Sequence, residues 1–385
     1  MNNVSEITNC CGCRACEQIC PVKCISFVKD AEGFLIPKVE KTKCIDCGKC
    51  LKTCAQNSYE NFNEVKEVYA ALHNDRKVVK DSTSGGAMTA FAEVVLQNGG
   101  VVYGTFLDTS DWKVKYAYID DIADICKFRG SKYVQADTLQ TYTEIKNFLK
   151  QGRLVLFVGT PCHVAGLYSF LSGIATDNLY TIDLLCHGTP SPELLVEHIK
   201  YSEEKYKRKL TGFSFRDKSK FPNKVAQRYE FENKKVYVLG KCDSFFQAFI
   251  SGSAYRMCCY DCRYATQERV GDITLGDYWG VRRFHSKIDN SDGISLILIN
   301  TAKGTELIEK ANLNLVKSDM QSAMAENGIL KAPSEKAACR AWFYEDIKSL
   351  GYGNALKKNV KVKSGAYNFI LTHLPKSVVK FLSKL

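Results

Sequence analysis

Eight of the 18 cysteines follow one spacing that occurs twice, and this repeat constrains the start of the chain more than any other feature. The first copy has the pattern C-x2-C-x2-C-x3-C-P, and the second begins 34 residues later: Cys10, Cys13, Cys16 and Cys20, then Cys44, Cys47, Cys50 and Cys54. A structural zinc site usually takes two separated C-x2-C pairs. Three cysteines at two-residue gaps with a fourth further on are typical of 4Fe–4S ligands. The repeat therefore favours two iron–sulfur clusters over zinc or disulfides.

With this spacing, the fourth cysteine of each copy is expected to ligate the cluster of the other copy. One cluster is therefore predicted on Cys10, Cys13, Cys16 and Cys54, and the other on Cys44, Cys47, Cys50 and Cys20. Cys11 and Cys24 fall outside the spacing and are predicted to be packing thiols. Residues 1–60 resemble the bacterial two-cluster ferredoxins, although Ala55 stands where that motif usually has proline.

Charge and hydropathy narrow the class of protein. From Lys331 onward, eleven Lys and Arg and three Asp and Glu give +8 of the net +11, whereas the preceding 42 basic and 39 acidic residues give +3. This distribution argues against a nucleic-acid-binding core. The opening MNNVSEITNC has no apolar signal core, and no apolar run approaches the roughly 18 residues of a membrane span. With so many cysteines, we expect a reducing, cytoplasmic location.

Periodicity beyond residue 60 predicts alternating strands and helices. Two short strands around Gly33 come first, in ISFVKDAEGFLIPKV. Further on, the predicted strands are VYAALH, VVYGTFL, LVLFVG and LYTIDLL, with helices after STSGG and after Ser191, where Pro192 takes the first position. FSFRDKSKFPNKVAQRYEFENKKVYVLG predicts antiparallel strands. We therefore expect an α/β protein (α+β overall), with a ferredoxin-like domain before a mixed α/β body that has a partly parallel sheet.

Two short segments have the composition of ligand-binding loops. Ser82, Ser84, Gly85 and Gly86 precede a helix start, where free backbone N–H groups and the helix dipole favour a phosphate. A capped helix on a tight turn explains the same residues, because the segment matches neither G-x-G-x-x-G nor G-x-x-x-x-G-K. In FRGSKYVQAD, two cations and an aromatic ring suit a phosphate and a flat ring, or an ordinary surface loop: Arg129, Lys132 and Tyr133.

Four further cysteines have candidate ligand positions. Cys162 in VGTPCH and Cys186 in LLCHG each follow an apolar strand directly, and Cys259 and Cys262 form a C-x2-C pair. Ligands of open α/β sheets bind beyond the carboxyl ends of strands, so these thiols can face one crevice. A third 4Fe–4S cluster, a zinc knuckle, and buried cysteines beside a turn all fit this pattern.

Polar residues near these cysteines do not specify a catalytic group. His163 and His187 each follow a strand-end cysteine, and histidines so placed more often satisfy a backbone hydrogen bond than transfer protons. Asp272 and Asp277 in GDITLGDYWG fit an alternating strand equally well. We therefore assign no catalytic residue from the sequence.

The order of these motifs resembles the beta-subunit family of coenzyme F-420-reducing hydrogenase and dehydrogenase, over roughly residues 1–320. The resemblance implies an FAD-containing iron–sulfur oxidoreductase, with the family's N-terminal, flavin-binding region at 61–146 and its C-terminal region at 147–330, before a basic tail at 331–385. It implies FAD contacts from Ser84, Gly85, Gly86, Ser131, Lys132 and Tyr133, to which we add Arg129 of the same loop. His163 stands where the family usually has glutamine.

These observations predict an electron relay. A flavin exchanges a hydride with a soluble carrier (a deazaflavin, a nicotinamide or ferredoxin) and passes single electrons to clusters. The chain is either such an enzyme, with or without a partner oxidoreductase subunit, or a non-catalytic electron-carrying subunit. A radical enzyme using S-adenosylmethionine is excluded, because Lys23 stands where its C-x3-C-x2-C motif would place the third cysteine after Cys16 and Cys20.

The last 22 residues predict a short basic amphipathic helix after Pro375. Its apolar positions are Val378, Val379, Leu382 and Leu385, and its cations are Lys376, Lys380 and Lys384. Such a helix packs on its own protein, contacts an anionic membrane weakly, or docks on an acidic partner.

Overall fold

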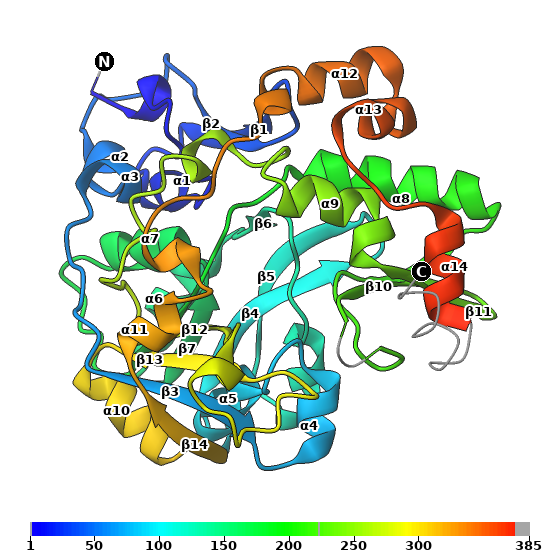
Figure 1. Cartoon of the computed structure of the whole chain (residues 1–385). Coiled ribbons are helices and arrows are strands. Elements are labelled where there is room, and N and C mark those ends of the chain that lie inside the picture. The colour runs from blue at the N-terminus through cyan, green and yellow to red at the C-terminus, as the bar shows by residue number, and fades with distance from the viewer. Residues whose placement is uncertain (1, 222–223, 374–385) are drawn as a thin grey trace.

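A computed structural model describes residues 2–221 and 224–373 (Figure 1). The N-terminal module begins with two cysteine loops, each followed by short helices, with a hairpin between them. Its elements are α1 (Ala15–Ile19), β1 (Ile25–Lys29), β2 (Leu35–Val39), α2 (Lys49–Lys52) and α3 (Ala55–Ser58). β1 and β2 are antiparallel, and Gly33 at their turn has φ +84°, so the predicted hairpin is confirmed.

A mixed sheet crosses the centre of the molecule (Figure 1). Among the described residues, nine strands lie in the order β14, β3, β13, β12, β8, β7, β4, β5, β6. Their bounds are β3 (Glu67–His73), β4 (Val101–Asp108), β5 (Lys113–Ile119), β6 (Ala136–Asp137), β7 (Val155–Gly159), β8 (Leu179–Leu184), β12 (Ile273–Asp277), β13 (Ser295–Ile299) and β14 (Leu313–Ser318). β4, β7, β8 and β12 run parallel. The predicted partly parallel sheet and α/β class are therefore confirmed.

Helices cover both faces of this sheet, which explains why its central strands are apolar without alternation. Val102, Leu156 and Ile182 pack with α5 on one face, and Tyr103 and Phe157 pack toward the other. The helices of this part of the chain are α4 (Arg76–Asp81), α5 (Ala87–Gln97), α6 (Thr141–Lys150), α7 (Pro161–Phe170), α10 (Ala302–Glu309) and α11 (Met320–Met324).

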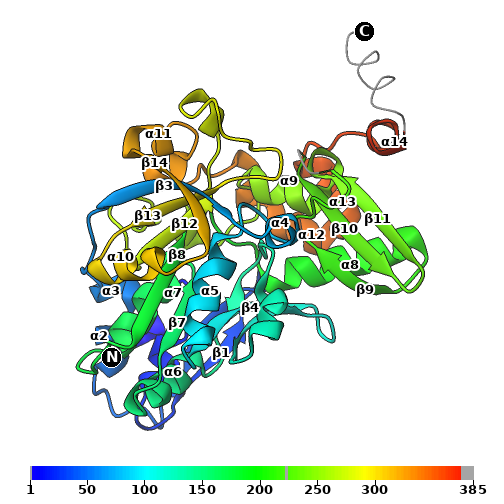
Figure 2. The ribbon, with the colours of Figure 1, turned by 90° about the horizontal axis from the view of Figure 1, so that it is seen from below.

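A small antiparallel sheet lies beside the main sheet, next to a group of helices (Figure 2). It contains β9 (Leu210–Ser214), β10 (Ala226–Phe231) and β11 (Lys234–Leu239), as the sequence predicted. The neighbouring helices are α8 (Pro192–Tyr206), α9 (Ser244–Ile250), α12 (Phe343–Leu350), α13 (Tyr352–Asn359) and α14 (Gly365–His373). Ser191 caps α8 and Pro192 takes its first position, as predicted.

The segment predicted as a basic tail is, as far as Val360, part of the folded body. Phe343, Tyr352 and Leu356 are buried in the main core. His198 of α8 lies 2.8 Å from the Tyr352 hydroxyl, which ties α13 to the body. The prediction of a tail rested on the number of charged residues and did not take these apolar side chains into account. Their burial offsets the entropy that is lost when the segment becomes ordered. The amphipathic helix predicted after Pro375 lies outside the described residues.

The N-terminal module shares a core with the body. Phe34, Ala55 and Tyr59 of the module belong to the same buried cluster as Phe157, Leu167 and Tyr264 of the body. Within the described residues, three ion pairs join the parts as well: Arg14 with Asp137, Lys29 with Glu193, and Arg340 with Glu32. None of the helices within residues 2–221 and 224–373 combines the length and the apolarity needed to cross a bilayer.

Candidate functional site

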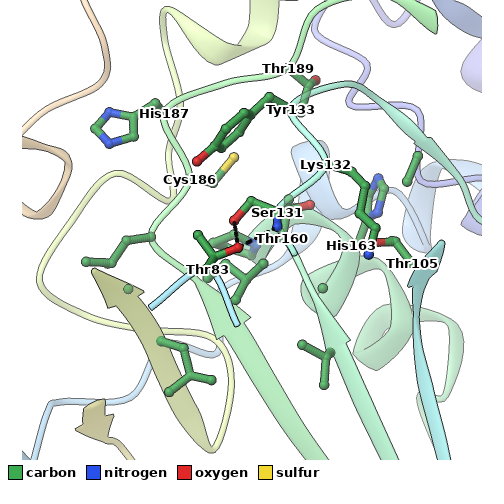
Figure 3. Close-up of a pocket in the computed structure, with 18 of the residues that line it drawn as sticks. Thr83, Thr105, Ser131, Lys132, Tyr133, Thr160, His163, Cys186, His187 and Thr189 are labelled. Carbon is green, nitrogen blue, oxygen red and sulfur yellow. Dashed lines mark hydrogen bonds between the residues drawn. The ribbon is translucent and has the colours of Figure 1, made fainter. Parts of the chain in front are cut away.

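A cavity of about 380 Å³ opens at the carboxyl ends of the parallel strands β4, β7, β8 and β12. Ligand pockets in proteins commonly have about 300–1,000 Å³, and open α/β sheets bind ligands at this edge. Figure 3 shows polar side chains from several elements pointing into the space above the strand ends. Residues from many separate chain segments line it, which is why no single motif identifies it.

The turn before α5 forms one wall. Gly86 is the residue before α5 and has φ +87°, a conformation that favours glycine; it has no side chain to cap the helix, and the Ala87 N–H donates to Ser295 Oγ (3.5 Å). The Ser84 hydroxyl donates to the Ile294 carbonyl (2.7 Å), which holds the turn against the sheet. Ser82, Ser84 and Gly86 line the cavity, so the start of α5 presents its backbone N–H groups there.

Gly85 lies in the same turn but does not line the cavity. A Cβ atom on Gly85 would lie 2.2 Å from the Ala71 carbonyl oxygen and 2.7 Å from the Ser295 nitrogen. The structure therefore gives Gly85 a packing role, in which glycine lets the turn approach β3 and β13. Its contact with a cofactor stays a prediction.

We expect Gly85→Ala to lower the free energy of unfolding by about 1–3 kcal/mol, because the backbone atoms must move apart. Urea unfolding measures this. Gly328→Ala is the matched control, because a Cβ there meets nothing within 4 Å. Equal stability of the two variants would contradict the packing role.

The loop 129–133 forms the facing wall and is joined to the α5 turn. The Ser131 backbone N–H donates to Thr83 Oγ1 (2.9 Å), and the two hydroxyls lie 3.4 Å apart (Figure 3). Arg129 Nε donates to Thr89 Oγ1 (3.3 Å). Tyr133 stacks on Phe249 with ring centroids 4.4 Å apart. The predicted residues Arg129, Ser131, Lys132 and Tyr133 all line the cavity.

Lys132 has an unusual environment for a cation. Its Nζ donates to the carbonyls of Phe128 (3.0 Å) and Arg129 (3.1 Å). Among the described residues it has no carboxylate partner, and burial lowers its pKa to about 7. An anion entering the cavity would restore the charged form.

The ends of β7 and β8 carry the histidines and cysteines that the sequence placed there. His163 is buried, its Nδ1 lies 3.2 Å from the Tyr116 hydroxyl, and burial lowers its pKa. Burial lowers the pKa of His187 as well. Both rings are therefore neutral at pH 7, and both line the cavity.

The four candidate cysteines of the body all line the cavity, and their convergence on one site stays a prediction; we call them the body set: Cys162, Cys186, Cys259 and Cys262. Burial, followed by the neighbouring Cys259 and Cys262, raises the pKa of Cys186 to about 12. Burial and Cys259 raise the pKa of Cys262 to about 11. Thiols that resist ionisation without a cation become ligands when a metal centre compensates their charge.

Cys11 was predicted to be a packing thiol, and it is buried, but it also lines the cavity. Hydrogen bonds from Cys13 and Cys162 lower its pKa well below the usual value. Cys11 therefore connects Cys13 of the N-terminal module with Cys162 of the body set. The eight-cysteine spacing did not reveal this position because the contact joins distant segments.

The eight repeated cysteines were predicted to form two sets, and this division stays a prediction. Burial, then Cys10, Cys54 and Cys50, raises the pKa of Cys16 well above its usual value. We call Cys10, Cys13, Cys16 and Cys54 the first N-terminal set. The second N-terminal set lines a separate small cavity: Cys20, Cys44, Cys47 and Cys50. Cys24 lines it as well, with its Sγ 3.5 Å from that of Cys20.

Across residues 2–221 and 224–373, no three His, Cys, Asp or Glu side chains have the spacing that would hold a single metal ion. A 4Fe–4S cluster differs, because each thiolate binds a separate iron. Cys13 and Cys16 of the first N-terminal set and Cys50 of the second are buried, whereas Cys47 of the second is exposed.

Thr83 and Arg216 are two of the cavity residues that the sequence prediction did not include. Thr83 lies inside the STSGG motif, and only its contact with Ser131 distinguishes it. Arg216 follows β9 and forms an ion pair with Asp277. Its guanidinium carbon Cζ lies 5.2 Å from the centroid of the Trp279 ring. No local pattern signals Arg216, because it reaches the cavity from the small sheet.

Comparison with protein families gives two adjacent matches. The model of the N-terminal part of the coenzyme F420 hydrogenase/dehydrogenase beta subunit matches residues 68–142. The model of the C-terminal part of the same protein matches residues 152–320. Together they cover more than half of the chain and contain the α5 turn, the 129–133 loop and the body set.

Similar curated proteins include the coenzyme F420-dependent sulfite reductase of Methanocaldococcus jannaschii, 23% identical over 80% of this chain and 46% of that protein. One subunit of the F420H2 dehydrogenase of Methanosarcina mazei is 21% identical over 49% of this chain and 56% of that protein. One subunit of the Na⁺-translocating ferredoxin:NAD⁺ oxidoreductase complex of Acetobacterium woodii is 34% identical over 17% of this chain and 18% of that protein. The chain thus spans about half or less of each relative.

Among solved structures, a chain of the F420-reducing NiFe hydrogenase complex of Methanosarcina barkeri is similar, with 16% identity and a TM-score of 0.48. The similarity covers 79% of this chain and 97% of that chain.

Proposed function

The chain belongs to the coenzyme F420 hydrogenase/dehydrogenase beta-subunit family, and on that premise we propose that it is an FAD-dependent iron–sulfur oxidoreductase. It relays electrons between a soluble hydride carrier, FAD and 4Fe–4S clusters. One observation carries the proposal: the α5 turn, the 129–133 loop and the body set all line a single cavity.

FAD, bound in this cavity, supplies the conversion between the two electrons of a hydride and the single electrons that a cluster accepts. The Thr83–Ser131 hydrogen bond holds the two walls together and keeps the α5 N-terminus open. Lys132 and Arg129 provide positive charge for a diphosphate, and Tyr133 provides a ring face held by Phe249. His163 is held by Tyr116 and is neutral, so it donates or accepts a hydrogen bond without adding charge.

The cysteine sets provide the other half of the proposal. The two N-terminal sets hold one 4Fe–4S cluster each, and the body set holds a third centre, with a 4Fe–4S cluster favoured over zinc. Cys11 lies between the first N-terminal set and the body set, which makes the centres a continuous series from the cavity outward. The second N-terminal set, with exposed Cys47, lies at the far end and faces an electron partner.

Anaerobic purification followed by cofactor extraction tests the proposal. We expect about one FAD and about four irons per cluster for each chain. NADH, NADPH, reduced ferredoxin and reduced deazaflavin are then screened as donors, with a partner oxidoreductase subunit added where available. A protein that holds clusters but no flavin would instead be a non-catalytic electron carrier. Zinc in the N-terminal sets, without charge-transfer absorption, would refute the cluster assignment.

Lys132 gives flavin binding a pH dependence. Its pKa of about 7 means that the ammonium charge is present below pH 7 and is lost as the pH rises through this value. Binding of FAD to the apoprotein should therefore be tighter at pH 6 than at pH 8, by up to about tenfold for one proton. Fluorescence titration of FAD measures the dissociation constant.

The matched variant for this test is Lys132→Arg, because a guanidinium stays charged over the whole range. We expect it to remove the pH dependence. Lys132→Met should bind FAD weakly at both pH 6 and pH 8. A wild-type dissociation constant that does not change between pH 6 and pH 8 would contradict the role of Lys132.

A further inference from the structure

Arg256 is a buried cation without an acidic partner. Only 5% of its surface is exposed, and no carboxylate of the described residues lies within ion-pair distance. Burial disfavours its charge, but the neighbouring thiols of Cys10, Cys258, Cys11 and Cys259 raise its pKa. A charge in this position is expensive unless an anion compensates it.

The guanidinium of Arg256 is directed at the loop of the first N-terminal set. Its Nε donates to the Cys10 carbonyl (2.5 Å), and its Nη2 donates to the Leu35 carbonyl (3.0 Å). Its Nη1 is buried and has no hydrogen-bond partner among the described residues. One strong donor therefore remains unused beside the cysteine loop.

A second unused donor lies at the same place. Gln135 is 2% exposed, its Oε1 accepts from the Leu35 backbone N–H (3.2 Å), and its Nε2 has no partner in the part of the chain that the structure describes. A Cβ atom on Gly12 would lie 2.0 Å from this Nε2 and 3.2 Å from Arg256 Nη1. The two donors thus converge on the backbone between Cys11 and Cys13, which only a glycine there permits.

We propose that Arg256, assisted by Gln135, raises the reduction potential of the centre held by the first N-terminal set. A cluster with four thiolate ligands is an anion, and one added electron makes it more negative. A fixed positive charge and hydrogen bonds beside its ligands stabilise the reduced form more than the oxidised form. The electron comes from the flavin, so this inference rests on the proposed function. It goes further by identifying which of the two N-terminal centres is easier to reduce.

The consequence is an order of potentials, with the first N-terminal set higher than the second. The second N-terminal set has no comparable buried cation among the described residues: Lys43 beside it is exposed and paired with Glu40. The first set should therefore accept an electron from the cavity side more readily than the second. Arg256 acts as a positioning residue in this scheme, because it changes the potential of a centre through the loop that carries its ligands.

The test is an EPR-monitored redox titration of the purified full chain, comparing Arg256→Gln with wild type. We expect the equilibrium constant for reduction of the first centre to fall about tenfold, which is about 59 mV for one electron. Arg256→Lys keeps the charge and should stay within a few-fold of wild type. Gln135→Leu removes the second donor and should shift the same centre in the same direction by less.

Arg340→Gln is the matched control. Arg340 is also a buried arginine that joins the body to the module, but its charge is paired with Glu32. A merely structural role of Arg256 would lower cluster content in both variants without changing the potential of the clusters retained.

Each outcome decides the inference. Equal potentials in Arg256→Gln and Arg340→Gln would overturn it, and so would a potential in Arg256→Lys as low as in Arg256→Gln. If Arg256→Gln does not retain the cluster, an unchanged potential in Gln135→Leu overturns it. A wild-type protein without clusters would refute the proposed function and this inference together, whereas clusters with unchanged potentials would refute the inference alone.

Discussion

Replacing Cys16 with alanine is expected to remove one complete cluster, so that iron falls by about four atoms per chain. Cys16 is buried and lies close to Cys10, Cys54 and Cys50. The sulfur-to-iron absorption in the visible range should fall by the same fraction. Iron analysis and absorption on anaerobically purified full-length protein measure both quantities.

The same change should destabilise the module beyond the loss of a single ligand. Three of the five buried residues in its separate core are cysteines: Cys16, Cys24 and Cys50, with Val4 and Ile25. So small an apolar core contributes little, and the free energy of cluster binding becomes folding free energy. Protease digestion should therefore cut the N-terminal 60 residues of Cys16→Ala more readily than those of wild type.

Cys126→Ala is the control for this experiment. Cys126 is exposed, on the short helix after β5, and donates weakly to the Ala123 carbonyl. It should keep all of the iron and the protease resistance. Full iron content in Cys16→Ala would show that the repeated cysteines do not hold the clusters as assigned.

Replacing Gly86 with valine is the second change for which we expect a large effect, a loss of FAD affinity of about tenfold or more. Gly86 has φ +87°, where a β-branched residue is a severe outlier. A Cβ there would lie 3.0 Å from His73 Cβ and 3.2 Å from a Val78 methyl. The side chain thus points away from the cavity and acts by displacing the first turn of α5, whose N–H groups are the proposed phosphate site.

Gly99→Val, just beyond the other end of α5, is the control that distinguishes the effect of backbone strain from the effect of displacing the proposed phosphate site. Gly99 also has positive φ (+72°), but nothing lies within 4 Å of its Cβ position. Both variants should lose stability by about 1–2 kcal/mol, and only Gly86→Val should lose flavin. Isothermal titration of apoprotein with FAD compares them. Equal FAD affinity in the two variants would remove the α5 turn from the site.

Much of this architecture was predictable because local physical rules decide it. Unbroken apolar runs predicted β7 and β8, since strands covered on both faces need no polar alternation. Ser191 as the cap and Pro192 at the first position predicted where α8 begins. The cysteines at the ends of β7 and β8 were predicted to face one crevice, because parallel strands end at one edge.

What the sequence did not reveal depends on contacts between distant segments. Arg256 and Gln135 belong to no motif, and their role arises only because Gly12 brings a cysteine loop against them. Gly85 and Gly86 are adjacent and looked equivalent, yet only one lines the cavity. The tail was predicted from its excess of basic residues, whereas the burial of Phe343 and Leu356 determines where this segment packs.

The shared core of the module and the body has a kinetic consequence. Small electron carriers normally work by diffusing between partners, so their rates depend on concentration and on the ionic strength that governs encounter. Here Phe34, Ala55 and Tyr59 are packed into the body, and Arg340 fastens the module at Glu32. Under the proposed function, transfer from the cavity to the N-terminal centres is a first-order event across a fixed gap, and only the exchange with an external partner depends on collision.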